Sequence, residues 1–142
     1  MVVSAHWTSH GVKVTSSHFL ETIHDFGGFP RKLEEMEYPA LGDPALAKRI
    51  KELLSVYDAQ LDPRRGLDHG AWSVLARLFP EADVPVVQVS LDATCAPREH
   101  MAIAQALAPL RDENILLLAS GNTVHNLRAF FLDNAKFLGP PL

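Results

Sequence analysis

Two histidines follow predicted buried strands, which is where an α/β protein often carries its chemistry. His6 comes directly after the apolar run at residues 2–5, and His125 follows the apolar run at 115–119 after a turn at 120–124. Ligands of open α/β sheets bind at the carboxyl ends of the strands, so we expect both imidazoles to point into one shared cleft. The plainer interpretation is that each histidine caps an element or lies at the edge of the core.

His24 and Asp25 lie in a predicted loop, residues 24–30, together with two glycines and two phenylalanines. Glycine lets a backbone approach a ligand closely, so the loop is a candidate to bring a histidine and a carboxylate to a site. The same residues also fit a rigid surface loop that is held by its phenylalanines.

Asp68 and His69 precede a stretch with helical spacing at residues 71–79. Asp68 is predicted to be the N-cap of that helix. His69 then lies at the positive end of the helix, where a neutral imidazole is favoured and can bond an anionic oxygen. The histidines without such a setting are interpreted as surface residues: His10, His18 and His100.

The available metal donors are nitrogen and oxygen. Cys95 is the only cysteine, which excludes an intramolecular disulfide and a zinc site with several thiolates. The chain has 7 histidines and 17 carboxylates, and this donor set suits iron, manganese or zinc.

Several familiar catalytic patterns do not occur in the sequence, among them a phosphate-binding loop, a dinucleotide fingerprint and a His-Glu-x-x-His helix. Ser120 is followed by Gly121 and Asn122 but lacks the Gly-x-Ser-x-Gly setting and an evident acid partner. Nucleophilic hydrolysis by a serine is therefore disfavoured.

The elements that position these residues alternate between helices and apolar strands. Strands are predicted at residues 2–5, 12–15, 84–89 and 115–119, helices at 44–57, 71–79 and 97–110, and a further helix or helical turn at 122–137. Asp43 followed by Pro44 is typical of a helix start. Uninterrupted apolar strands between helices indicate a mainly parallel sheet covered on both faces, so the sequence predicts an α/β sandwich.

Composition and charge narrow the class of protein. The chain is 47% hydrophobic and 21% charged, which is typical of an ordered protein, and its net charge is −4. A weakly acidic protein has no general attraction to nucleic acid or anionic lipid, so neither is an expected partner. The apolar stretches are too short to cross a bilayer and no signal peptide is recognisable, so we expect a cytoplasmic protein.

Five motifs together resemble one family, the DOPA-dioxygenase-like branch of the class III extradiol ring-cleavage dioxygenases in the LigB-like superfamily. The resemblance follows the order and spacing of the motifs along essentially the whole chain. The motifs are Val-Ser-Ala-His-Trp at 3–7, Glu-Thr-Ile-His-Asp-Phe-Gly-Gly-Phe-Pro at 21–30, Gly-Leu-Asp-His-Gly-Ala-Trp at 66–72, Pro-Val-Val-Gln-Val-Ser at 85–90 and Ser-Gly-Asn-Thr-Val-His-Asn-Leu at 120–127.

The resemblance implies a three-layer α/β/α domain with a non-haem metal, ferrous iron for catalysis and often zinc in isolated proteins. By this resemblance His6 is a metal ligand and His125 is the catalytic acid and base. His69 and Asp25 match positions that line the substrate pocket. The implied reaction is extradiol cleavage of DOPA or a related catechol with dioxygen.

The resemblance also implies that residues 1–142 are one partial catalytic domain, the central portion of such a protein, incomplete at both ends. The family's first histidine ligand lies upstream of the first motif and its third ligand lies downstream of the last, which leaves His6 as one of three. We therefore expect weak metal binding and little activity from this chain alone. Two alternatives remain, a metal-free interaction module of the same fold and a zinc-dependent hydrolase.

Overall fold

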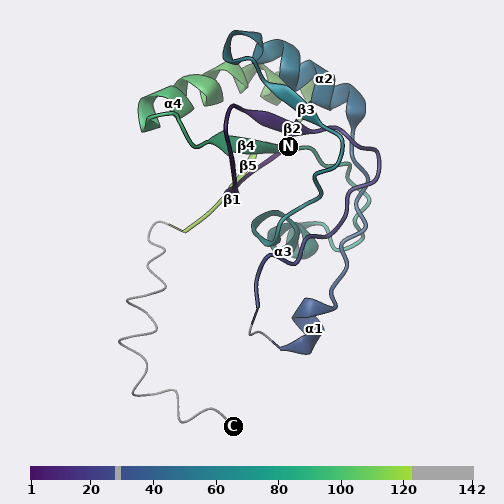
Figure 1. Cartoon of the computed structure of the whole chain (residues 1–142). Helices are drawn as coiled ribbons and strands as arrows, with labels where there is room; N and C mark the ends of the chain where they lie inside the picture. The colour runs from purple at the N-terminus through teal and green to yellow at the C-terminus, as the bar shows by residue number, and fades with distance from the viewer. Residues whose placement is uncertain (28–29, 123–142) are drawn as a thin grey trace, which may run out of the picture.

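A five-stranded sheet lies at the centre of the computed structural model, which describes residues 1–27 and 30–122. The strand order is β3-β2-β4-β1-β5 (Figure 1). β1 pairs in parallel with both β4 and β5, β2 pairs in parallel with β3, and the β2–β4 pairing is antiparallel, so the predicted mainly parallel sheet is confirmed. The bounds of the strands are β1 Val2–Ser9, β2 Lys13–Thr15, β3 Gln60–Asp62, β4 Gln88–Asp92 and β5 Leu118–Ser120.

Four α-helices and two 3-10 helices occur in the described part of the chain. They are α1 Arg31–Glu34, α2 Pro44–Leu53, α3 His69–Leu78, α4 Pro97–Ala106, η1 Ser55–Tyr57 and η2 Ala108–Glu113. α2 begins where the sequence predicts, because the Asp43 carboxylate accepts the backbone N–H groups of Ala45 at 3.0 Å and Leu46 at 2.9 Å. None of the described helices is long and apolar enough to span a membrane.

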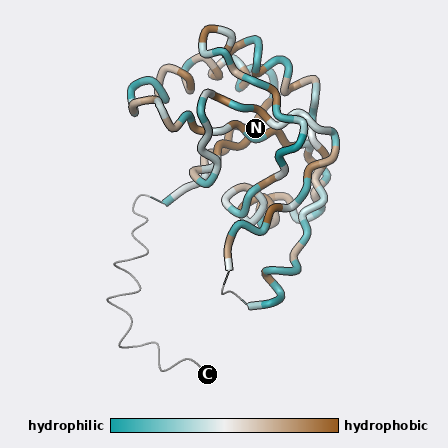
Figure 2. Tube along the Cα trace, viewed as in Figure 1, coloured by the Kyte–Doolittle hydropathy of each residue, from teal (hydrophilic) through white to brown (hydrophobic). Residues whose placement is uncertain are grey.

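The helices cover both faces of the sheet, which makes the architecture three-layered (Figure 1). On one face, α2 and α4 pack on the sheet through a cluster that includes Ile50, Val89 and Ile103. On the other face, α3 packs through a cluster that includes Val2 and Trp72. Figure 2 shows apolar residues gathered along the central strands between these layers. The predicted α/β/α sandwich is confirmed.

The boundaries of several predicted elements are shifted. The helix predicted at 97–110 ends at Ala106 and continues as η2, because Pro109 has no N–H to extend an α-helical ladder. The strand predicted at 84–89 begins only at Gln88 as β4, and that predicted at 115–119 begins only at Leu118 as β5. The helix predicted at 122–137 lies almost wholly outside the described residues.

The prediction that the first strand ends at Ala5 is wrong, because β1 continues to Ser9. Its register against β4 shifts on the way: Val3 pairs with Val89, whereas Thr8 pairs with Leu91. Five steps along β1 therefore oppose two along β4, which is a bulge in β1. His6 lies within this bulge rather than beyond the end of the strand.

Candidate functional site

His6 of β1 and His69, the first residue of α3, lie against each other. Their ring centroids are 3.9 Å apart, with the ring planes inclined at 47°. Both rings line an open hollow of about 420 Å³, together with Gly70, Ser73 and Val74 of α3 and residues 119–122 at the end of β5. The hollow lies at the carboxyl end of β5, where a parallel sheet is expected to bind a ligand.

Asp25 holds His69 through two hydrogen bonds to one oxygen. Its Oδ1 lies 2.6 Å from Nδ1 of His69 and accepts the backbone N–H of the same residue at 3.2 Å. An ionised carboxylate only accepts, so Nδ1 carries the proton and Nε2 of a neutral ring carries the lone pair. The loop thus brings a carboxylate into contact with His69, and the role of Asp25 in lining a substrate pocket stays a prediction.

The Asp25 carboxyl is tuned by this contact. Partial burial acts to raise its pKa, but the hydrogen bonds from the side chain and backbone of His69 outweigh burial, and the net shift is to a lowered pKa. The carboxylate therefore stays ionised and keeps His69 in the tautomer described above.

Aromatic side chains pack next to His69. Phe26 meets the His69 ring edge-on, with centroids 5.3 Å apart, and lies 5.9 Å from the ring of Trp72. Trp72 is fully buried, and its indole N–H donates to the carbonyl of Ile23 at 2.9 Å. His24 in the same loop is 2.9 Å from the carbonyl of Met36 through Nε2, so it fastens the loop rather than lining the hollow.

Gly70 allows the two histidines to approach. A Cβ atom at this position would lie 2.4 Å from Oγ of Ser4 and 2.8 Å from Cδ2 of His6. Both distances are far inside contact range, so a side chain at residue 70 would force α3 away from β1. Gly70 belongs to the motif at 66–72 but was not predicted to be a site residue, although its position directly after His69 was a usable signal.

Asp68 caps α3 as predicted, accepting the backbone N–H of Ala71 at 3.1 Å. Its fully buried carboxylate also binds Ser4 and Gln88, which the sequence analysis did not single out. Local sequence gives no signal for these partners, because they come from β1 and β4.

The remaining histidines have varied settings. His10 and His18 are exposed, as predicted. His100 is half-buried, and its Nε2 is enclosed in a second, apolar hollow formed by α4, β4 and β5, so its interpretation as a solvated residue is wrong. His125 and Phe29, the second phenylalanine of the loop at 24–30, lie outside the described residues, and the shared cleft of His6 and His125 stays a prediction.

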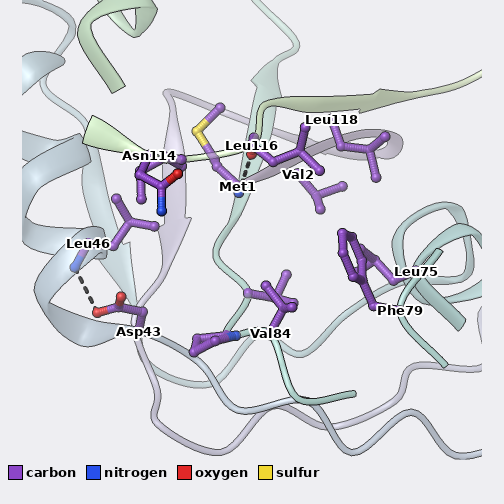
Figure 3. Close-up of a pocket in the computed structure, with 13 residues that line it drawn as sticks. Met1, Val2, Asp43, Leu46, Leu75, Phe79, Val84, Asn114, Leu116 and Leu118 are labelled. Carbon is purple, nitrogen blue, oxygen red and sulfur yellow. Dashed lines mark hydrogen bonds between the residues drawn. The ribbon is translucent and has the colours of Figure 1, made fainter. Parts of the chain in front are cut away.

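A further apolar hollow lies at the opposite, amino ends of β1 and β5 (Figure 3). Leu75, Phe79 and Val84 line it, and the amino group of Met1 donates to the carbonyl of Leu116 at 2.8 Å. Asp43 is the carboxylate that lines this hollow, and it already accepts hydrogen bonds as the cap of α2.

Within residues 1–27 and 30–122, no group of three or more histidine, cysteine or acidic side chains is arranged to hold a metal ion.

The structure defines the class of this protein as a three-layer α/β fold with a pair of histidines at the carboxyl end of a strand. A carboxylate orients one histidine of this pair. The family model described as "Catalytic LigB subunit of aromatic ring-opening dioxygenase" matches residues 1–136. The chain therefore belongs to this LigB family.

Curated relatives carry corresponding names. The chain is 51% identical over 129 residues to the "4,5-DOPA dioxygenase extradiol" of Escherichia coli K12, covering 90% of this chain and 48% of that protein. It is 43% identical over 128 residues to the protein of the same name from Beta vulgaris, covering 88% and 48%. It is 37% identical over 133 residues to "Dioxygenase tasH" of Hapsidospora irregularis, covering 91% and 41%. The chain thus spans about half the length of these relatives or less.

A solved structure agrees with the fold. The crystal structure of an uncharacterized protein from Escherichia coli K12 superposes with a TM-score of 0.74 at 39% sequence identity. The match covers 98% of this chain and 59% of that one.

Proposed function

We propose that this chain carries the central part of an extradiol dioxygenase site that cleaves the ring of DOPA or a related catechol with dioxygen. The observation that carries the proposal is the contact between His6 and His69, with His69 oriented by Asp25, in a chain of the LigB family. Residues 1–142 would act as one partial catalytic domain.

His6 is the proposed metal ligand among the described residues. An imidazole nitrogen at the edge of an open hollow is a donor that both iron and zinc accept, so the residue type fits the group. When bound, a non-haem ferrous ion would supply coordination positions for the catechol oxygens and dioxygen, and zinc would be a substitute in isolated protein. By the resemblance we propose that the other two ligands come from segments outside residues 1–142, and that ring cleavage requires those segments as well.

His69 and Asp25 are the proposed substrate-binding pair. With Nδ1 committed to Asp25, Nε2 of His69 can accept a hydrogen bond from a hydroxyl group of the catechol. Asp25 would fix the ring that makes this bond, and Phe26 and Trp72 would limit its movement from behind. His125 is the proposed acid and base, which takes a proton from the catechol and returns it during ring opening.

The proposed partners are small molecules only, with no nucleic acid and no membrane surface. A cytoplasmic location is part of the proposal, and the half-buried free thiol of Cys95 fits it.

The test uses a chimaera in which this chain is flanked by the corresponding terminal segments of the Escherichia coli relative. The chimaera and the 142-residue chain are each loaded with ferrous iron under anaerobic conditions, mixed with DOPA and exposed to air. We expect oxygen consumption and a yellow ring-opened product from the chimaera, and little from the chain alone. A variant with His18 replaced by alanine serves as the control, because this histidine is exposed and lies outside the hollow.

Other outcomes would contradict the proposal. Ester or amide turnover with zinc, without catechol cleavage, would favour a hydrolase. A chimaera that retains no metal would favour an interaction module.

A further inference from the structure

A buried carboxylate lies behind the two histidines, at the junction of β1, β4 and α3. The Asp68 side chain is fully buried. Its Oδ1 accepts the hydroxyl of Ser4 at 2.7 Å and the N–H of Ala71 at 3.1 Å, and its Oδ2 accepts the amide N–H of Gln88. A buried charge needs such partners, and the guanidinium of Arg65 adds a counter-charge 3.5 Å away.

The network reaches His6 through Ser4. While the Ser4 hydroxyl donates to Asp68, its oxygen accepts the backbone N–H of His6 at 3.2 Å. The ladder between β1 and β5 also ends at Ser4, which pairs with Ser120. The bulge that turns His6 toward the hollow is thus bonded at its first residue to Asp68.

The same carboxylate reaches His69 through the helix cap. By accepting from Ala71, Asp68 fixes the first turn of α3, in which His69 and Gly70 are the first two residues. Gly70 then lies directly on Ser4 and His6, with no space for a Cβ atom. One side chain therefore holds both the strand that carries His6 and the helix that carries His69.

We infer that Asp68 is a positioning residue that sets the relative placement of the His6 and His69 rings by acting through Ser4 and the α3 cap. Asp68 does not itself line the hollow. The placement of the two rings is a property of the chain itself. Only the effect of that placement on catechol cleavage rests on the proposed function.

The partners of Asp68 indicate which substitution would preserve the network. Oε1 of Gln88 is buried without a hydrogen-bond partner. In Asp68→Asn, the introduced amide oxygen can still accept from Ser4 and Ala71, and the Gln88 amide can rotate so that its oxygen accepts from the introduced NH2 group. Asp68→Ala instead leaves the Ser4 hydroxyl and the Gln88 amide without their acceptor, and leaves the Ala71 N–H with only the backbone carbonyl of residue 68 at 2.9 Å.

The test is NMR spectroscopy of the histidine rings in the metal-free chain, with the rings assigned from His6→Gln and His69→Gln. We expect nuclear Overhauser cross-peaks between the two rings, since their centroids are 3.9 Å apart. Ser4→Ala should lose these cross-peaks and shift the His6 ring resonances while keeping the α3 cap. Asp68→Ala should shift both rings, and Asp68→Asn should restore the cross-peaks.

Asp43→Ala is the matched control, because Asp43 caps α2 in the same manner but is remote from the histidines. It should lower the melting temperature as a lost cap does, yet leave the cross-peaks unchanged. Unchanged ring spectra in Ser4→Ala would overturn the inference, as would loss of the cross-peaks in Asp43→Ala. The spectra need no metal or catechol, so failure here leaves the ring-cleavage proposal standing, and the reverse also holds.

Discussion

Oδ1 of Asp25 lies 2.6 Å from Nδ1 of His69 and also accepts the backbone N–H of His69, so one oxygen atom fixes both the ring and the main chain of this residue. The two residues come from a loop and from the first turn of α3. Their contact sets the tautomer on which the proposed role of His69 depends.

Replacing Asp25 with alanine should lower catechol turnover in the chimaera by about 10–100-fold, the usual effect of losing a carboxylate that orients a functional histidine. Asp25→Asn should be milder, because the amide oxygen can still accept from His69. The measurement is kcat/KM for DOPA, with Asp43→Asn as a remote control. An Asp25→Ala variant with full activity would remove His69 and Asp25 from the proposed site.

His6 and His125 should respond differently to substitution by alanine in the chimaera. His6→Ala should abolish iron binding, because it removes a proposed ligand. His125→Ala should retain iron and slow turnover by roughly 10²–10⁴-fold, as expected for loss of a positioned acid or base. Iron content and product formation, measured on the same samples, separate the two. Iron retention by His6→Ala would show that the ligand is another residue.

Gly70→Ala should destabilise the chain by about 1–3 kcal/mol, the range for overpacking a tight contact, because its methyl group would overlap Ser4 and His6. Gly27→Ala is the control, since nothing lies within 4 Å of a Cβ atom there. Urea unfolding followed by circular dichroism measures both. Equal stability of the two variants would mean that α3 and β1 are not in close contact.

The stability of the fold in acid should depend on Asp92. Hydrogen bonds from the backbone and hydroxyl of Thr94, and from the N–H of Gly11, lower the pKa of Asp92 from 3.8 to about 2. Because the folded-state pKa is depressed, this contribution to stability is fully present above pH 3.8 and is lost as the pH falls toward about 2.

Asp92→Asn should therefore be less stable than the parent chain above pH 3.8, and the difference should shrink as the pH approaches 2. Melting temperatures across this range measure it, with exposed Asp112→Asn as the control. If the difference in melting temperature between the parent chain and Asp92→Asn grew as the pH fell, the proposed contribution of Asp92 to stability would be contradicted.

Features that depend on neighbouring residues were predicted well from the sequence. The starts of α2 and α3 are predicted by their capping residues, Asp43 and Asp68. A cap bonds residues only two or three positions ahead, so its signal is local in the sequence. Apolar runs likewise predicted the layers, since strands covered on both faces are typically rich in apolar residues.

Features that depend on distant residues were not predicted. The bulge in β1 arises from pairing with β4, so the apolar run at 2–5 carried no signal that the strand would continue past His6. Ser4 and Gln88 look like ordinary strand residues until the fold brings them to Asp68. His100 was misjudged for the same reason, because the apolar surface that encloses its Nε2 comes from β4 and β5.

Both tryptophans of the chain lie in the elements that carry the two histidines, Trp7 in β1 with His6 and Trp72 in α3 with His69. Trp72 lies behind Phe26 and His24, and the nearly buried Trp7 adjoins His6 in β1, with the Arg65 guanidinium 5.3 Å above its ring. Indole emission is sensitive to nearby charge and to water. The indole fluorescence of the chain therefore comes from the strand that carries His6 and the helix that carries His69, and it offers an unlabelled optical signal for changes in these two elements.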